Sequence, residues 1–167
     1  VDEGVVGSER AVESIEFGSV IADRYTILRH DKAGLPGTFV CREAGAEPLR
    51  SVWAWKPKNT LDPQAEAFVA EMTKVAKLEH PQLQKVLDFG RDPAGIFYSV
   101  YEPTEVQNLT ALLDRDWPLS DERIVWLMCQ LLATLEAAHA AGVVHGDLRP
   151  ENVLVRAAAD SQNDEIV

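Results

Sequence analysis

The chain has 167 residues, a length typical of one domain, and a formal net charge of −11 at pH 7. Hydrophobic residues make up 46% of it and charged residues 26%, the composition of a globular protein with a sizeable core. The negative charge argues against nucleic acid as a partner, because contact with phosphates requires a basic face. The sequence contains no run of about 18 apolar residues, so we expect no membrane partner within this chain.

The cysteines and the N-terminus give two further expectations. Cys41 and Cys129 lack metal-ligand spacing, and we expect two buried thiols in the reducing environment of a cytoplasmic protein rather than a disulfide. Residues 1–21 carry several acidic side chains against Arg10 alone and show little apolar periodicity. This segment is therefore expected to be an acidic, flexible leader.

Residues 22–103 are mostly typical of short strands. Alternating or β-prone runs occupy 24–28, 37–43, 51–56, 83–90 and 95–102. A helix is predicted between the third and fourth strands, because Asp62 can cap it and Pro63 fits its first turn. Its residues Phe68, Met72 and Val75 recur at helical spacing and are expected to face the sheet.

Residues 104–167 begin with a helical pattern. A short helix is predicted at 108–116 and a long one at 119–142, with Ser120 as its N-cap and Gly142 at its end. The long helix is apolar on nearly every side, so we expect it to be buried all round. The remaining residues scarcely suffice to cover it, and we expect further protein to do so.

The segment HGDLRPENVLV, residues 145–155, places an aspartate, a cation and an amide close together. Asp147, Arg149 and Asn152 could orient a hydroxyl, neutralise a phosphoryl group and offer a neutral oxygen to Mg²⁺, which is what phosphoryl transfer requires. The alternative is a turn rich in Asp, Pro and Asn that stops one helix and starts a strand.

The order of these motifs resembles the protein kinase family from about residue 22 to residue 167. The resemblance implies an α+β fold: a five-stranded antiparallel N-lobe sheet with one helix, over 22–103, then the first helices and catalytic loop of a mainly helical C-lobe, over 104–167. It implies that Asp147 and Arg149 are catalytic, that Asn152 binds Mg²⁺ and that the loop has the Ser/Thr-kinase form.

The same resemblance implies a binding site for ATP. Lys56 would contact the phosphates and pair with Glu71, although Glu71 could instead form a surface pair with Lys74. Gly34 and Gly37 match two of the three glycines of a phosphate-binding loop, and Lys32 stands at the first. The adenine pocket would comprise Tyr101 as gatekeeper, backbone groups of Glu102 and Thr104, Val40 or Ala54 beside the ring, and Phe39 and Leu154 as walls.

One motif is misplaced with respect to this family. Asp88-Phe89-Gly90 spells the family's metal-binding triplet but precedes the catalytic loop, so we interpret Asp88 as a turn residue at a strand end. The metal-binding triplet is expected after Val167. The chain alone is therefore expected to be catalytically inactive.

The resemblance implies that the full-length protein transfers the γ-phosphoryl group of ATP to Ser or Thr of a protein substrate. Two alternatives remain open. A pseudokinase or nucleotide-binding scaffold is favoured by Lys32 and by Gly146, which replaces the usual arginine before Asp147. A small-molecule kinase of the aminoglycoside-phosphotransferase type is favoured by the His-Gly-Asp sequence at 145–147.

Overall fold

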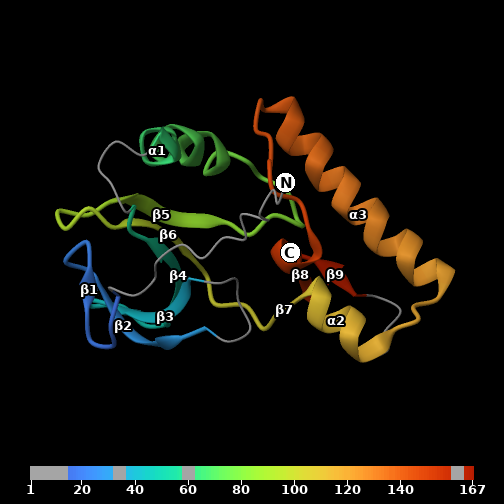
Figure 1. The fold of residues 1–167 in the computed structure, drawn as a ribbon, viewed down its shortest axis with the longest axis horizontal. Coiled ribbons are helices and arrows are strands. Elements are labelled where there is room, and N and C mark those ends of the chain that lie inside the picture. The colour runs from blue at the N-terminus through green and yellow to red at the C-terminus, as the bar shows by residue number, and fades with distance from the viewer. Residues whose placement is uncertain (1–14, 32–36, 58–62, 159–163) are drawn as a thin grey trace, which may run out of the picture.

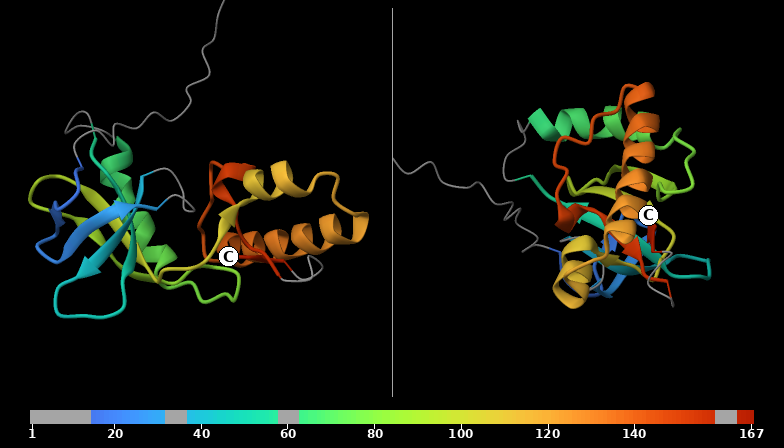
Figure 2. Two further views of the ribbon diagram at one scale, coloured as in Figure 1. Left: turned by 90° about the horizontal axis from the view of Figure 1, so that it is seen from below. Right: turned by 90° about the vertical axis from the view of Figure 1, so that its right-hand side faces the viewer.

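A computed structural model describes residues 15–31, 37–57, 63–158 and 164–167, and the side chains of 63–66 lie outside this description. Figure 1 shows two parts, a curled sheet carrying one helix and a helical part with a small second sheet. A turned view separates the two parts along the long axis of the molecule (Figure 2). Along the chain, strands are followed mainly by helices after about residue 104.

The larger sheet is antiparallel and has six described strands in the order β1-β2-β3-β4-β6-β5. Its strands are β1 (Val20–Ile21), β2 (Tyr25–His30), β3 (Thr38–Glu43), β4 (Arg50–Trp55), β5 (Val86–Arg91) and β6 (Phe97–Tyr101). The expectation of five strands is wrong by one, because β1 pairs with β2. Ile15 and Ile21 are buried in the core of this sheet, so residues 15–21 are not part of a loose leader.

Strand alternation divides the side chains of β4 between two environments. Val52 and Ala54 are fully buried in the core that forms inside the curl of the sheet, together with residues of β2, β3 and β6. Trp53 and Trp55 project from the other face of β4, where Phe68 and Phe97 pack against them. The two faces of β4 therefore pack against different sets of residues, and alternation along the strand decides which set a side chain contacts.

The helix over the sheet is α1 (Pro63–Val75), and Asp62, its expected cap, lies outside the described residues. Phe68 faces the sheet as predicted, with its ring centroid 5.6 Å from that of Phe97 and 6.0 Å from that of Trp53. These aromatic contacts stabilise the packing of α1 beyond the apolar area that they bury.

Asp88 lies within β5 rather than at the end of a strand, which corrects that detail of the sequence interpretation. The pairing with β6 shifts register between Val86 and Asp88. The Asp88 Oδ2 accepts a hydrogen bond of 2.7 Å from the hydroxyl of Tyr25. Burial and this contact raise the pKa of Tyr25, so the hydroxyl stays protonated. Asp88 therefore serves as a hydrogen-bond partner within the large sheet.

The helical part contains α2 (Leu109–Asp116), α3 (Asp121–Ala140), the 3-10 helix η1 (Pro150–Asn152) and a sheet ordered β7-β8-β9. The strands are β7 (Gln107–Asn108), β8 (Leu154–Arg156) and β9 (Glu165–Ile166). Asn108 and Ser120 cap α2 and α3 with their side chains, and the second of these caps was predicted. Leu112, Leu127 and Val155 form the centre of a separate core.

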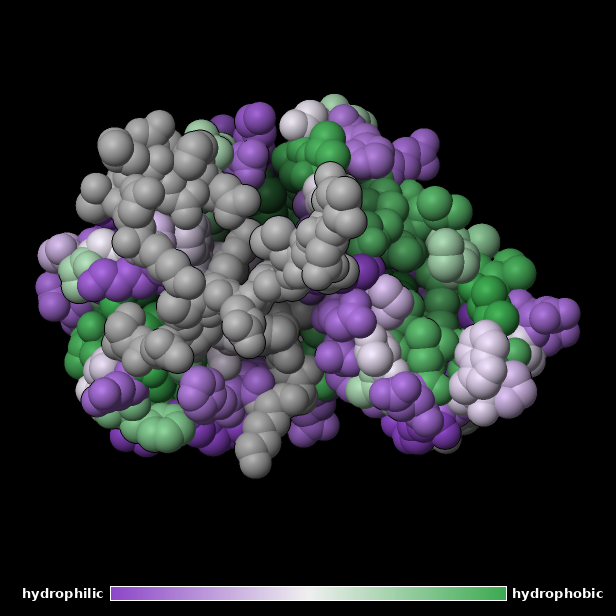
Figure 3. Space-filling model, viewed as in Figure 1, coloured by the Kyte–Doolittle hydropathy of each residue, from purple (hydrophilic) through white to green (hydrophobic). Residues whose placement is uncertain are grey.

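Much of α3 is exposed, in line with the expectation that the residues of this chain scarcely suffice to cover it. Val125 is 59% exposed and Leu132 57%, and Ile124, Trp126 and Met128 are also exposed. Figure 3 shows this hydrophobic surface over α3. None of the helices within the described ranges is long and apolar enough to cross a bilayer.

A buried ion network fixes α3 to the second sheet. Arg123 donates from Nε to the Oδ2 of the fully buried Asp164 at 2.7 Å, and from Nη2 to Asp116 at 2.7 Å. The other Asp164 oxygen accepts from the backbone of Ala158 at 2.9 Å. Hydrogen bonds from Arg115 and Arg123 hold the pKa of Asp116 well below its ordinary value, which shows that the carboxylate form is strongly favoured.

The two thiols should differ sharply in reactivity. Both cysteines are free, but only Cys41 is buried, so the expectation of two buried thiols is wrong for Cys129. Burial raises the pKa of Cys41 to about 12, and the thiolate is the reactive form. We expect a thiol reagent at pH 8 to modify the native chain in one fast phase that Cys129→Ser removes. Two fast phases of equal amplitude in the folded chain would contradict this assignment.

Candidate active site

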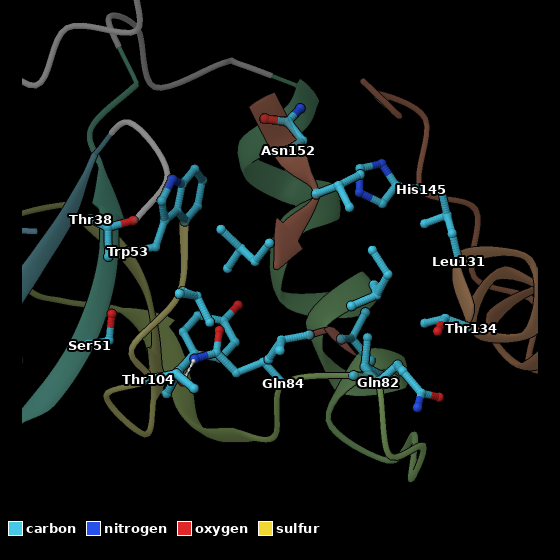
Figure 4. A pocket seen from close by; sticks show the side chains of 18 of the residues that line it. Thr38, Ser51, Trp53, Gln82, Gln84, Thr104, Leu131, Thr134, His145 and Asn152 are labelled. Carbon is cyan, nitrogen blue, oxygen red and sulfur yellow. Dashed lines mark hydrogen bonds between the residues drawn. The ribbon is translucent and has the colours of Figure 1, made fainter. Parts of the chain in front are cut away.

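A cavity of about 310 Å³ lies between the two parts of the molecule. Thr38, Ser51 and Trp53 border it from the sheet, whereas Leu131, His145 and Asn152 border it from the helical part (Figure 4). This volume is at the lower end of the range for small-molecule sites, which are usually apolar clefts with a few convergent polar groups. The cavity has that character, and the segment 145–155 forms part of its wall.

The loop from His145 to Asn152 is folded into a compact hydrogen-bonded turn. Gly146 has φ of +74°, a left-handed conformation that glycine adopts without steric cost. The side-chain Nδ2 of Asn152 donates to the backbone oxygen of Asp147 and to its Oδ2, both at 2.9 Å. An Nη2 of Arg149 donates to the same Oδ2 at 3.1 Å. The aspartate, cation and amide that the sequence singled out are therefore brought together.

Local sequence explains how these three side chains meet. Pro150 opens the one-turn helix η1, where a fixed φ and a missing N–H cost nothing. That turn brings Asn152 back over Asp147, and β8 then begins at Leu154. The Asp147 side chain is 62% exposed, so a macromolecular acceptor could reach it.

Lys56 and Glu71 do not form the pair that the resemblance implies. Lys56 follows the end of β4 and is exposed, and it does not line the cavity. Glu71 is exposed on α1, and neither side chain has an ion-pair partner within the described part of the chain. β4 ends at Trp55, so Lys56 lies just beyond the strand that contributes Ser51 and Trp53 to the cavity.

Two predicted walls of the adenine pocket are core residues instead. Phe39 and Ala54 are fully buried in the core of the large sheet, and neither borders the cavity. Val40 borders a separate hollow near Thr104. Gly37 has φ of +84° and lies against Trp53, where a Cβ would come 3.5 Å from the indole Nε1. Gly34 and Lys32 lie outside the described residues.

The other predicted pocket residues are present at the cavity. Tyr101, Thr104 and Leu154 line it, and burial raises the pKa of Tyr101. Glu102 is exposed and does not line the cavity, but its backbone oxygen accepts a hydrogen bond of 3.0 Å from Nε2 of Gln84. The same Nε2 donates to the hydroxyl of Thr104 at 3.0 Å, and Figure 4 shows this contact.

Sequence reasoning missed Trp53 and Gln84 as site residues. Ser51, Trp53 and Trp55 alternate along the predicted strand and so lie on one of its faces, which is the signal that could have found Trp53. The strand had been interpreted through Lys56 instead. No comparable signal marks Gln84, because its role depends on a loop folding back against residues 18 and 20 positions further along the chain.

A phosphotransferase would require a magnesium ion, and Asn152 is a described cavity residue with an oxygen free to bind one. Asn152 donates both of its hydrogen bonds from Nδ2, which leaves Oδ1 as a neutral oxygen for a metal. Among the described residues, no cluster of three or more His, Cys, Asp or Glu side chains is arranged to hold a metal ion. The described residues thus offer a magnesium ion one neutral ligand, Oδ1 of Asn152, and no cluster of carboxylates.

A nucleoside triphosphate fits in part. The apolar walls and the amide and hydroxyl groups near Gln84 suit a flat heteroaromatic base. The described residues that line the cavity include no lysine or arginine, so the phosphates meet no lining cation. The described lining therefore suits the base and contributes no cation to the phosphates.

Comparison with known sequences gives a consistent result. The protein kinase domain family matches residues 41–162. The serine/threonine-protein kinase pkn3 of Myxococcus xanthus is 41% identical over 140 residues, covering 83% of this chain and 26% of the relative. PknE of Mycobacterium tuberculosis, another serine/threonine-protein kinase, is 36% identical over 152 residues, covering 90% of this chain and 26% of the relative. The chain thus spans about a quarter of these relatives.

Solved structures support the same fold. A double mutant of the PknI kinase domain of Mycobacterium tuberculosis superimposes with a TM-score of 0.72 over 92% of this chain and 60% of that domain, at 21% identity. At this identity the similarity establishes the architecture alone. It confirms the predicted α+β class, with a sheet-rich lobe followed by the start of a helical lobe.

Proposed function

This chain belongs to the protein kinase family, and on that premise we propose that the full-length protein carrying it phosphorylates serine or threonine side chains of protein substrates. The observation that supports this proposal is the assembled loop in which Asn152 and Arg149 both hold the Oδ2 of Asp147. Phosphoryl transfer needs positioned and charged groups more than covalent chemistry, and this loop supplies both.

The proposed roles follow from the hydrogen bonds of the loop. Oδ2 of Asp147 is occupied, whereas Oδ1 has no partner among the described residues and can accept the proton of an acceptor hydroxyl. Arg149 places a cation beside that carboxylate, where negative charge accumulates during transfer. A bound Mg²⁺–nucleotide would supply the phosphoryl group, and Asn152 Oδ1 is the described atom available to the metal.

A second candidate function is a non-catalytic member of the family that binds a nucleotide or serves as a scaffold. The observation in its favour is that Lys56 and Glu71 are exposed and unpaired within the described residues, with Lys56 outside the cavity. A small-molecule kinase of the aminoglycoside type shares the His-Gly-Asp sequence but has no further support from the cavity.

One experiment separates these candidates. The full-length protein is incubated with γ-labelled ATP and Mg²⁺, with a general protein acceptor such as casein or with an aminoglycoside. Label in phosphoserine or phosphothreonine after acid hydrolysis is the expected result. Label on the aminoglycoside alone would favour the small-molecule enzyme. No label on either, from a folded protein, would favour the non-catalytic candidate.

A further inference from the structure

We propose that Gln130 is a positioning residue of the candidate active site: its side-chain amide takes the place of a neighbouring strand beside β9 and so holds β9 in the wall of the cavity. Ile166 and Val167, at the end of β9, line that cavity together with Leu154 of β8. The effect of Gln130 on phosphotransfer rests on the proposed function, whereas its contacts with β9 do not.

The strand β9 lies at an edge of the small sheet. The order of that sheet is β7-β8-β9, so β8 pairs with one side of β9 only. The N–H of Val167 donates to the backbone oxygen of Leu154 at 2.9 Å, which marks a hydrogen-bonded pair of the antiparallel ladder. Such pairs alternate with non-hydrogen-bonded ones, so the backbone groups of Ile166 and Asp164 point away from β8. Both residues are buried, and these groups therefore need partners within the protein.

Gln130 supplies these partners from α3, which lies beside β9 (Figure 1). Its Nε2 donates to the backbone oxygen of Asp164 at 3.0 Å, and its Oε1 accepts from the N–H of Ile166 at 3.2 Å. A side-chain amide thus presents a donor and an acceptor to the strand edge, as the peptide groups of an adjacent strand would. Gln130 is 8% exposed, so both hydrogen bonds form in a desolvated site, where an unmade bond is costly.

The two ends of this contact have unequal support. The backbone oxygen of Asp164 also accepts from Nε1 of Trp126 at 2.8 Å, and the carboxylate of Asp164 is bound by Arg123. For the N–H of Ile166, Gln130 is the one partner among the described residues. Removal of the Gln130 amide would therefore leave a buried N–H unpaired on a residue that borders the cavity.

A displacement of β9 would reach the catalytic loop through β8. Val167 is hydrogen-bonded to Leu154, and Leu154 begins β8 two residues after Asn152. These three residues border the same cavity. The position of β9 is thus coupled to the part of the wall that carries Asn152, and a misplacement of about 1 Å in an active site can cost roughly 10²-fold in rate.

The first measurement is hydrogen–deuterium exchange of the full-length protein, read by mass spectrometry in peptides that contain residues 164–167. Gln130→Met removes both hydrogen bonds from a side chain of similar length. It should speed exchange there by about 5- to 150-fold, the equivalent of one buried polar group left unpaired. Trp126→Phe keeps a ring and leaves Gln130 in place, so its effect should be smaller. Glu136→Gln, at an exposed position of α3, should leave the exchange unchanged.

The second measurement is phosphotransfer by the same full-length variants as a function of pH. Gln130→Met should lower the rate by about fivefold or more at every pH. Gln130→Glu keeps the acceptor for Ile166, but its ionised carboxylate has no proton to donate to the backbone oxygen of Asp164. Burial raises the pKa of such a carboxyl, so the rate of this variant relative to wild type should rise from pH 8 to pH 6. The nearby charges of Arg123, Asp116 and Asp164 are common to every variant.

Exchange at 164–167 that is unchanged in a folded Gln130→Met protein would overturn the inference. An equal loss of rate in Gln130→Met and Gln130→Glu at every pH would also overturn it, since protonation should restore the donor only in the second. Should Gln130→Met fail to fold, exchange of Gln130→Glu relative to wild type at pH 8 and pH 6 supplies the same comparison. Faster exchange in Gln130→Met, with no phosphotransfer by the wild-type protein, would support the contact and overturn the kinase proposal alone.

Discussion

Replacing Asp147 with asparagine is expected to lower the rate of Ser/Thr phosphorylation by the full-length protein by about 10²- to 10⁴-fold. Asparagine preserves the shape of the side chain but cannot take up the hydroxyl proton and removes the charge that Arg149 meets at 3.1 Å. The measurement is label transfer under conditions where product forms linearly with time.

The matched control is Asp114→Asn, an exposed aspartate on α2 that does not border the cavity. It removes the same charge elsewhere and should leave the rate unchanged. Both variants should retain stability within about 0.5 kcal/mol, since the two carboxylates are exposed. An Asp147→Asn protein that keeps more than half of the wild-type rate would exclude the proposed role of this loop.

Arg123→Met is expected to lower the free energy of unfolding of the chain by about 3–5 kcal/mol, the cost of leaving a buried charge without its partner. Asp164 is fully buried and depends on Arg123 for both of its charge-assisted contacts on Oδ2. Such a loss is a large share of the about 5–15 kcal/mol that stabilises a typical domain. Urea unfolding followed by circular dichroism measures it.

Two further variants test whether burial is the cause. Arg115→Met removes an arginine that is 51% exposed and also contacts Asp116, so its effect should stay within about 1 kcal/mol. Adding Asp164→Asn to Arg123→Met removes the stranded charge and should recover part of the loss. Equal effects of Arg123→Met and Arg115→Met would show that the network is not a buried determinant of stability.

Local patterns explain which parts of the molecule could be predicted from its sequence. The strands, the two long helices and the Ser120 cap depend on neighbours within a few positions, and the structure reproduces them. Asp147, Arg149 and Asn152 belong to the same class, because five residues and one proline suffice to fold the turn that joins them. This part of the site could be predicted because its three residues are close together in the sequence.

The sequence predicted Lys56 as a site residue, and the structure leaves it exposed and outside the lining of the cavity. The face of a strand on which a side chain lies depends on how the sheet packs, and local sequence alone does not decide it. Phe39 and Ala54 lie in the core of the large sheet and not at the cavity. Trp53, which does line the cavity, was not predicted as a site residue. The pair of Arg123 and Asp164, which are 41 residues apart, has no signature in a single sequence.

The central claim is that this kinase-family chain brings Asp147, Arg149 and Asn152 together beside the cavity, while Lys56 is exposed and does not border it. The most direct measurement is the acetylation of Lys56 by a water-soluble acylating reagent, quantified by peptide mass spectrometry with and without millimolar Mg-ATP. Lys56 is exposed and outside the cavity, so ATP should change its acetylation rate by less than about twofold, within the spread for an uninvolved surface lysine such as Lys77. Strong protection of Lys56 by ATP, with Lys77 unaffected, would contradict this account.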